Sequence, residues 1–317
     1  MKVVARSEND FSRAALELAA GELVAFPTET VYGLGANALD SAAVARIFAA
    51  KSRPRFNPLI VHVHDFGVAT EYAEFSSLAE ELADAFWPGP LTLVLPRIEN
   101  CALSPLVSAG LDTVALRSPA HKVARHLLET AQLPIAAPSA NRSGRISPTS
   151  AADVQAELGD FPAMILDGGR CPIGLESTVL RITEDGPQIL RSGALPREEI
   201  EEVLGRKLTS FGGEEGAPLS PGQLASHYAP ESAIRLNVTD PGSGEAFMAF
   251  GPDAPPFEGP SINLSESGDL QEAAANFFSA LRELDEADVT SIAVMPIPFT
   301  GLGEAINDRL QRAAAER

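Results

Sequence analysis

Side chains able to bind an anion are concentrated at a few places in the chain, and the first is Lys51-Ser-Arg-Pro-Arg-Phe-Asn57. This stretch contains one proline and precedes another, so it cannot be the interior of a helix or of a central strand. Lys51, Arg53 and Arg55 stand at alternate positions, which in an extended chain places their side chains on one side. Such a fork suits phosphate or carboxylate, although a solvated basic turn explains this stretch equally well by itself.

A second polar stretch, Ser139-Ala-Asn-Arg-Ser-Gly-Arg-Ile-Ser-Pro-Thr149, lies between an apolar segment and a predicted helix. It offers hydroxyls, an amide and two arginines at the end of a predicted strand. Ser139 and Ser147 can donate to phosphate oxygens, and the N-terminus of the following helix adds to such an anion site. A polar loop without a ligand is the alternative, but the density of donors favours a binding site.

Further donors stand at the ends of other predicted strands. Thr113 and Arg117 bound one such strand, Arg191 ends another, and His62 lies in the strand 59–63 that follows the first cationic stretch. Open α/β sheets bind ligands at strand ends, so we expect these side chains to converge. A lone strand histidine is more often a core or surface group, and His62 draws interest only because it follows the cations.

These residue types favour nucleotidyl transfer over nucleophilic catalysis. The sequence has no Gly-x-Ser-x-Gly elbow, Walker loop, dinucleotide-binding glycine fingerprint or metal-spaced set of His and Cys. Lysines and arginines with hydroxyl and amide donors can instead hold a triphosphate and stabilise the charge that develops on it. The residues alone do not name the acceptor of the nucleotidyl group.

The apolar periodicity predicts the elements that must position these side chains. Helices are expected at 11–20 (capped by Asp10), 41–51, 76–86, 119–130, from about 149, 196–204, 270–284 and 303–314, and strands at 23–26, 59–63, 91–95, 113–117, 134–138, 178–182, 187–191 and 292–295. Helices that alternate with strands predict an α/β fold, and the closely spaced strands 178–182 and 187–191 predict a mixed sheet. The last two helices are expected to contribute only core.

Turn-forming residues divide the chain. Residues 208–222 lack an apolar period, which is typical of a linker. We therefore predict a first domain at 1–207, a linker at 208–230 and a small α/β domain at 231–317. The linker ends with a histidine and a tyrosine, at positions 227 and 228. Both types are rare in this chain and this segment need not form a core, so we expect a functional role there.

The composition limits the kinds of partner. The chain has 317 residues, is 45% hydrophobic and carries a net charge of −19, with −7 in residues 1–207 and −12 in residues 208–317. This acidic balance argues against broad affinity for nucleic acids or membrane surfaces. Two cysteines without pairing or ligand spacing, an N-terminus unlike a signal peptide and the lack of an apolar span predict a cytoplasmic protein.

Five motifs follow one another in a recognisable order: Pro27-Thr-Glu-Thr-Val-Tyr-Gly-Leu-Gly35; Lys51-Ser-Arg-Pro54 with Asn57-Pro-Leu59; Ala137-Pro-Ser-Ala-Asn141 with Ser143-Gly144 and Ser147-Pro-Thr149; Glu176-Ser-Thr-Val179; and Ser220-Pro-Gly222 with His227-Tyr-Ala-Pro230. In these motifs the chain resembles the YrdC-type threonylcarbamoyl-adenylate synthases, in the long form with a C-terminal domain. The resemblance implies a YrdC-like twisted open mixed sheet with helices, followed by a small Rossmann-like α/β domain. It also implies that L-threonine, bicarbonate and ATP are joined into threonylcarbamoyl-AMP and pyrophosphate, for tRNA threonylcarbamoyladenosine modification by a partner transferase complex.

The same resemblance implies roles for individual residues. It places Thr30, His62, Arg117, Ala137 and Ser177 around L-threonine, and Lys51, Arg53, Asn57, Thr113, Ser139, Ser147, Arg191 and Tyr228 around ATP. Lys51, Arg53 and Arg117 are expected to be catalytic, with Arg117 pairing the threonine carboxylate. Mg²⁺ is expected on the phosphates, without a protein metal ligand, and Tyr228 would make residues 208–230 a lid. Any contact with tRNA is expected to be weak or indirect.

Two alternatives stay open. One is an RNA-binding module without catalysis, which the net charge and the lack of aromatic residues among the cations disfavour. The other is a carbamoyl transferase of the hydrogenase-maturation type. That type carries zinc-finger and acylphosphatase modules, to which this sequence shows nothing comparable.

Overall fold

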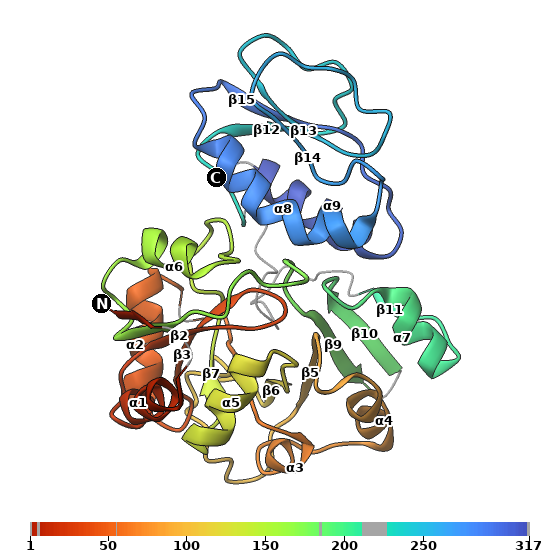
Figure 1. Cartoon of the computed structure of the whole chain (residues 1–317). Helices are drawn as coiled ribbons and strands as arrows, with labels where there is room; N and C mark the ends of the chain where they lie inside the picture. The colour runs from red at the N-terminus through yellow and green to blue at the C-terminus, as the bar shows by residue number, and fades with distance from the viewer. Residues whose placement is uncertain (1, 5–6, 55, 184–185, 211–226, 316–317) are drawn as a thin grey trace.

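Two sheets organise the chain (Figure 1). The structure is a computed structural model that describes residues 2–4, 7–54, 56–183, 186–210 and 227–315. The larger sheet has, in spatial order, β1 (Lys2–Val4), β8 (Met164–Leu166), β2 (Val24–Pro27), β3 (Tyr32–Asn37), β7 (Ile135–Ala136), β4 (Ile60–His62), β6 (Thr113–Arg117), β5 (Leu91–Pro96), β9 (Thr178–Thr183), β10 (Gly186–Arg191) and β11 (Thr209–Ser210). The smaller sheet has β12 (Ala233–Arg235), β15 (Ser291–Val294), β13 (Ala246–Ala249) and β14 (Ser261–Asn263), which pair in parallel.

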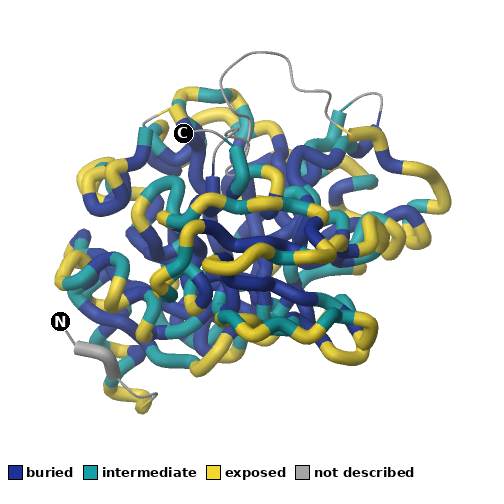
Figure 2. The backbone as a smooth tube through the Cα atoms, turned by 90° about the horizontal axis from the view of Figure 1, so that it is seen from above, coloured by how far each residue is buried: buried dark blue, intermediate teal, exposed yellow. Residues whose placement is uncertain are grey.

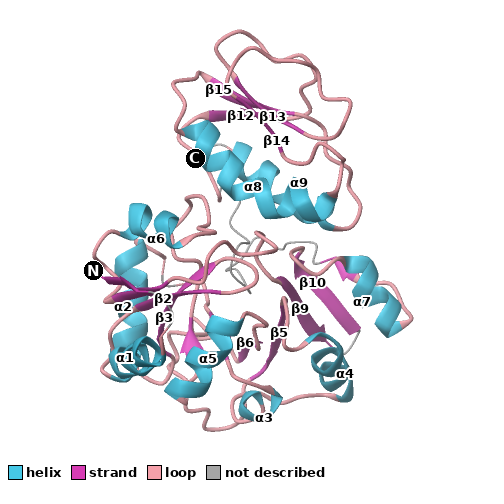
Figure 3. Ribbon diagram, viewed as in Figure 1, coloured by secondary structure: helices cyan, strands magenta, loops and turns pink. Residues whose placement is uncertain are grey.

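Helices alternate with the strands (Figure 3). They are α1 (Glu8–Ala19), α2 (Ser41–Lys51), α3 (Phe66–Ala69), α4 (Ser77–Phe86), α5 (Lys122–Ala131), α6 (Ala151–Leu158), α7 (Arg197–Leu204), α8 (Leu270–Asp285) and α9 (Leu302–Ala314). Ser7, Asp40, Ser76 and Ser150 precede α1, α2, α4 and α6, and each side chain accepts a hydrogen bond from a backbone N–H of the first turn. These caps satisfy donors that a helix N-terminus otherwise leaves unpaired.

The larger sheet is mixed, as the sequence predicts. β4 and β6 run parallel, with His62 opposite Arg117, whereas β9 and β10 form the expected antiparallel pair. β2 and β3 are also antiparallel. The predicted α/β class with a mixed sheet and a second, smaller α/β domain is therefore confirmed.

The two faces of the larger sheet are covered by different helices. Phe26 and Ile135 pack with residues of α1 and α5 on one face, whereas Leu34 and Val61 pack with residues of α2 and α4 on the other. The central strands are accordingly buried along their length (Figure 2). Because side chains alternate along a strand, His62 points to the face opposite Val61, toward Phe26, whose ring lies 6.0 Å from the imidazole.

The C-terminal domain places α8 and α9 toward the first domain (Figure 1). Phe277 and Ile306 of these helices belong to an apolar cluster that also contains Val31 and Leu175 of the first domain. The burial of apolar surface therefore continues across the contact between the domains, which favours a fixed arrangement of the two.

Three local predictions are wrong. Ser7, not Asp10, caps α1, and Asp10 completes a capping box from the third helical position. The stretch after Lys51 is not extended, because Ser52 adopts a left-handed conformation (φ 51°) where α2 ends, and the N–H of Arg53 donates back to the carbonyl of Phe48. The apolar periodicity predicts no strand at β1, β3, β8, β11, β12, β13 or β14, and β11 lies within the stretch 208–222 that is predicted to be a linker. Arg55 lies outside the described residues.

Other predictions stay untested. The predicted lid falls largely on residues 211–226, which lie outside the described residues, so the boundaries at 207 and 230 remain predictions. Within the part of the chain that the structure describes, no helix is both long and apolar enough to cross a membrane. The cytoplasmic location remains a prediction.

Candidate functional site

A pocket lies at the ends of β2, β4, β6 and β10. The loop that follows β7 and the last residues before β9 also line it. Nine of the residues assigned to threonine or ATP line it: Thr30, Arg53, His62, Arg117, Ala137, Ser139, Ser177, Arg191 and Tyr228. The fold thus brings together side chains that are far apart in the sequence. What each of them binds remains a prediction.

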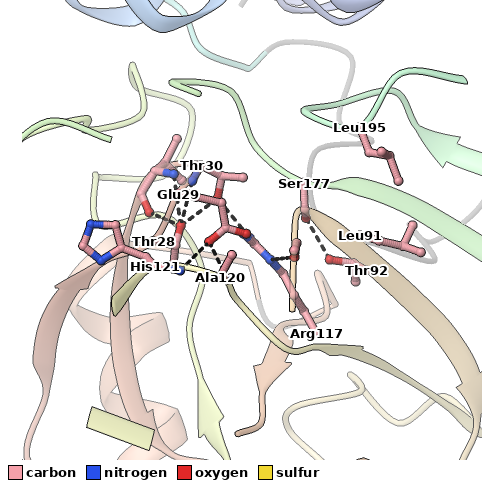
Figure 4. A network of polar contacts seen from close by, with 12 residues as sticks. Thr28, Glu29, Thr30, Leu91, Thr92, Arg117, Ala120, His121, Ser177 and Leu195 are labelled. Atoms are coloured by element: carbon pink, nitrogen blue, oxygen red, sulfur yellow. Dashed lines mark hydrogen bonds and ion pairs between the residues drawn. The ribbon is translucent and has the colours of Figure 1, made fainter. Parts of the chain in front are cut away.

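Arg117 is held at the wall of the pocket by three acceptors (Figure 4). Its Nη2 lies 2.5 Å from Oε1 of Glu29, its Nη1 donates to Thr30 Oγ1 at 2.9 Å, and its Nε donates to the carbonyl of Gly89 at 3.2 Å. The second oxygen of Glu29 accepts from the backbone N–H of Ala120 at 3.0 Å. A substrate carboxylate that pairs with Arg117 must therefore share a guanidinium that Glu29 already contacts.

Arg191 reaches back from the end of β10 to the start of β9. Its Nη2 donates to the carbonyl of Ser177 at 2.8 Å and to Ser177 Oγ at 3.1 Å. That hydroxyl also lies 2.8 Å from Thr92 Oγ1 (Figure 4). Burial lowers the pKa of Arg191. Ser177 is thereby fixed from two sides within the wall of the pocket.

Arg53 is fixed by its own loop. Its Nη2 donates to Asn57 Oδ1 at 2.6 Å and to the carbonyl of Pro58 at 2.9 Å, and its Nε donates to the carbonyl of Asn57 at 3.2 Å. Burial, and then the charge of Arg191, lowers the pKa of Arg53 to about 9. Because the two guanidiniums destabilise each other's charged form, an anion bound between them would stabilise both.

Lys51 lies behind the pocket and does not line it. Its ammonium donates to the carbonyl of Ser139 at 2.5 Å and to that of Asn141. Burial, followed by the charge of Arg53, holds the pKa of Lys51 well below its usual value. The side chain is 1% exposed, so in this structure it anchors the loop that carries Ser139 into the pocket.

Three other residues assigned to ATP do not line the pocket either. Asn57 supports Arg53, and Ser147 donates to Glu176 Oε1 at 2.6 Å. Thr113 stands at the start of β6, four residues before Arg117, or about 13 Å away along an extended strand. The fold does not bring Thr113 to the pocket, and its assignment to the nucleotide remains a prediction.

Several buried polar atoms around the pocket have no hydrogen-bond partner. Among them are Asn57 Nδ2, His62 Nδ1 and His227 Nδ1. Burial, and then the charge of Arg117, lowers the pKa of His62 to about 3, so the imidazole is neutral near pH 7. Buried polar groups normally have partners because leaving them unpaired costs free energy. A polar ligand in the pocket would supply partners for His62 and His227, which line it.

Tyr228 lines the pocket and is 1% exposed. Its φ of 62° is uncommon for a residue other than glycine, so its contacts must hold it there. The ring lies 4.1 Å from that of His227 and 5.6 Å from that of Phe278, and the next N–H, of Ala229, donates to the carbonyl of Gly144 at 2.8 Å. Residues 227–229 are thus fixed against both domains.

Comparison with known proteins gives the family. A family model described as telomere recombination (Sua5, YciO and YrdC) matches residues 17–193, and one described as threonylcarbamoyl-AMP synthase, C-terminal domain, matches residues 195–315. The curated threonylcarbamoyl-AMP synthases of Pyrococcus abyssi and Bacillus subtilis are 43% and 41% identical to this chain. The matches cover 94% and 98% of it and 92% and 95% of the relatives. This chain belongs to the threonylcarbamoyl-AMP synthase family.

Solved structures agree with this membership of the threonylcarbamoyl-AMP synthase family. The crystal structure of P. abyssi Sua5 complexed with L-threonine superposes with a TM-score of 0.92 at 40% identity, over 99% of this chain and 98% of that one. Escherichia coli YciO superposes with a TM-score of 0.55 at 21% identity, over 61% of this chain, and shows the fold of the first domain alone. The family is one of enzymes, so the alternative of an RNA-binding module without catalysis is set aside.

Some ionisable residues at or beside the threonylcarbamoyl-AMP synthase pocket have no role assigned from the sequence. Glu176 and His227 line the pocket, and Glu29 contacts Arg117 in its wall. Glu29 and Glu176 belong to the motifs that carry the resemblance, and His227 precedes the assigned Tyr228. Arg309 comes from α9 and donates to Glu176 Oε2 at 3.0 Å. The apolar residues Ile306 and Leu310 of the same helix are core, as predicted. The signal was an arginine on the apolar face of the helix, three residues after Ile306.

Proposed function

We propose that this chain makes threonylcarbamoyl-AMP from L-threonine, bicarbonate and ATP. The amine of threonine forms a C–N bond to the bicarbonate carbon, and water leaves. An oxygen of the resulting carbamate then bonds to the α-phosphorus of ATP while the bond to the β-phosphate breaks, so that pyrophosphate leaves. Partner proteins in the cytoplasm would pass the activated group to tRNA.

The observation that carries this proposal is the meeting of three buried guanidiniums with small hydroxyl side chains in one pocket. Arg53, Arg117 and Arg191 line it together with Ser139 and Ser177. Fixed cations and hydroxyl donors stabilise the charge that moves through a phosphoryl group without taking part in covalent chemistry. The chain needs no nucleophile of its own for this reaction.

The amino-acid half of the pocket is assigned to the end with Thr30, His62, Arg117, Ala137 and Ser177. The neutral imidazole of His62 can accept from or donate to an uncharged amine, and Arg117 can share its guanidinium with a carboxylate. The L-threonine complex of P. abyssi Sua5, which superposes over 99% of this chain, supports the assignment.

The nucleotide half is assigned to the end with Arg53, Ser139, Arg191 and Tyr228, supported from behind by Lys51, Asn57 and Ser147. Among the described residues, no group of three or more His, Cys, Asp or Glu could hold a metal ion. Glu176 lines the pocket, but its oxygens accept from Ser147 and Arg309. Mg²⁺ would therefore be held by the phosphates, where it would neutralise their charge.

The proposed reaction also requires that water be kept out of the pocket. A carbamate reverts readily to amine and bicarbonate in water, so adenylation must occur in a closed site. Tyr228 and His227 line the pocket and are buried. They are suited to keep the carbamate from solvent until its oxygen is adenylated.

The test is pyrophosphate release by the full-length chain with each substrate omitted in turn. We expect release only when L-threonine, bicarbonate and ATP are all present. Release from ATP alone, or release that L-threonine does not stimulate, would contradict the proposal. Serine in place of threonine, which lacks only a methyl group, should give a reaction that is slower by about tenfold to two-hundredfold, as is usual for one missing methyl.

A further inference from the structure

Arg309 is a fully buried cation that the C-terminal domain inserts beside the pocket of the first domain. Its relative exposure is 0%, and it comes from the middle of α9. A guanidinium is rarely buried to this extent unless it is paired and hydrogen-bonded. The partners of Arg309 therefore indicate what this residue stabilises.

The first partner is Glu176, which lines the pocket. Arg309 Nε donates to Oε2 of Glu176 at 3.0 Å, and Ser147 Oγ donates to Oε1 at 2.6 Å. Burial by itself would raise the pKa of Glu176, but the charges of Arg309 and Arg191 and the hydroxyl of Ser147 hold it below its usual value. Glu176 is thus kept ionised and is held between the two domains.

The second and third partners also belong to the pocket or adjoin it. The guanidinium carbon of Arg309 lies 5.2 Å from the centre of the Tyr228 ring, a distance at which a cation and an aromatic face attract. Its Nη1 donates at 2.8 Å to the carbonyl of Ser192, the residue after Arg191, and at 2.6 Å to Oδ2 of the adjacent Asp308. Arg309 of α9 therefore contacts two residues that line the pocket, Tyr228 and Glu176, and the backbone of Ser192, next to Arg191.

A fourth observation concerns the remaining nitrogen. Nη2 of Arg309 is buried and has no hydrogen-bond partner. A buried donor without an acceptor destabilises the folded protein. An arginine that only joined the two domains could have all its donors paired. Other arginines cross the same contact without this cost: Arg282 of α8 pairs with Glu157 at 2.9 Å and donates to the carbonyl of Ile146 at 3.1 Å.

We propose that Arg309 is a positioning residue for the nucleotide half of the pocket, through which the C-terminal domain completes the site. It acts by fixing Glu176, and through it Ser147, and by holding the Tyr228 ring over the bound nucleotide. The inference rests on the proposed function for the identity of the nucleotide. It assigns to the second domain a role in binding ATP that the first domain cannot fill alone.

The experiment compares full-length Arg309→Met, Arg309→Lys and Glu176→Gln variants and the Arg309→Met/Glu176→Gln double variant. We expect Arg309→Met to raise KM for ATP at least tenfold and KM for threonine less than threefold. Arg309→Lys, which keeps the charge but cannot reach Glu176 and Ser192 with a planar fork, should lie between this variant and the unaltered chain. The double variant should be no worse than Arg309→Met, because the two residues act as one unit.

The matched control is Arg282→Met, which removes an arginine from the same domain contact without touching a residue that lines the pocket. It should leave KM for ATP within twofold. Calorimetric titration with a non-hydrolysable ATP analogue measures binding without turnover, so a failure of this inference is separable from a failure of the proposed reaction. If Arg309→Met does not fold, Arg309→Lys serves in its place. A folded Arg309 variant that binds the analogue as tightly as Arg282→Met would overturn the inference. It would also be overturned if the increase in KM for ATP in the double variant equalled the product of the increases in Arg309→Met and Glu176→Gln.

Discussion

The guanidinium of Arg117 lies 2.5 Å from the carboxylate of Glu29, and side-chain exposures of 4% and 8% exclude most solvent from the pair. Glu29 therefore sets where Arg117 stands in the pocket. Breaking a buried pair from one side leaves the other charge unpaired and costs about 3–5 kcal/mol. We expect Glu29→Gln to lower the free energy of unfolding by that order and to raise KM for threonine at least tenfold, as measured by denaturant titration and steady-state kinetics.

The control is the Arg46–Glu22 pair, which has the same 2.5 Å separation but side-chain exposures of 52% and 42%. Exposed pairs contribute about 0–1 kcal/mol. Glu22→Gln should therefore leave both stability and KM nearly unchanged. Equal effects of the two substitutions would show that Glu29 does not position Arg117.

Lys51 gives a second prediction. Its ammonium anchors the carbonyls of Ser139 and Asn141, and Ser139 lines the pocket. Lys51→Met should release the loop that carries Ser139, a donor that lines the pocket, and should thereby lower kcat for pyrophosphate release. Loss of one fixed donor at a reacting group costs about 10²–10³ in kcat, which sets the size of the expected effect. L-threonine should still bind, as calorimetry would show. Lys207→Met, which removes an ammonium that is 88% exposed, is the control and should retain full turnover.

The sequence predicts the parts of this site that depend on local periodicity better than those that depend on contacts between distant segments. Strand ends with cations predicted the convergence of Arg53, Arg117 and Arg191, because apolar periodicity locates strands and ligands bind where they end. The assignment of Lys51 to the nucleotide remains a prediction, and its contacts with the carbonyls of Ser139 and Asn141 were not predicted. A pattern of residue types does not say which acceptors a side chain at a helix end reaches, and here they lie 88 and 90 positions further along the chain.

Most of the unpredicted strands are short. β8 is three residues long, and β12 and β14 are as short, so none spans enough positions to show a period of two. β3 contains two glycines, which indicate turns in a sequence, but here Cβ atoms would collide with a neighbour: one at Gly35 would lie 2.8 Å from both Ile135 and Phe26. The contact of Arg309 with Glu176 joins residues 133 positions apart. Only the docking of two domains determines such a contact.

A third prediction concerns pH. Burial and then Arg117 lower the pKa of His62 from 6.5 to about 3, so between these values the unfolded chain binds a proton that the folded chain does not. Stability is therefore fully present above pH 6.5 and is lost as pH falls toward 3, at up to about 1.4 kcal/mol per pH unit. Denaturant titrations at pH 7, 6 and 5 should show this loss. A His62→Gln variant should show a shallower slope, and an identical slope would contradict the assignment.

A fourth prediction tests the backbone beneath the pocket. A Cβ at Gly193 would lie 2.4 Å from the carbonyl oxygen of Glu176 and 2.5 Å from that of Ser177, and neither backbone atom can rotate away. Gly193→Ala should cost about 1–3 kcal/mol or more and should lower turnover, because both neighbours line the pocket. At Gly67 the nearest atom, in the side chain of Asp65, is 3.4 Å away. Gly67→Ala should be close to neutral in both assays.

The most direct measurement is the mass of the nucleotide product formed by the full-length chain from ¹³C-bicarbonate, unlabelled L-threonine and ATP. A single pocket that holds the carbamate of threonine against the α-phosphate predicts an adenylate that carries one ¹³C atom and one threonine. An unlabelled threonyl adenylate, or AMP without an attached threonine, would contradict the account.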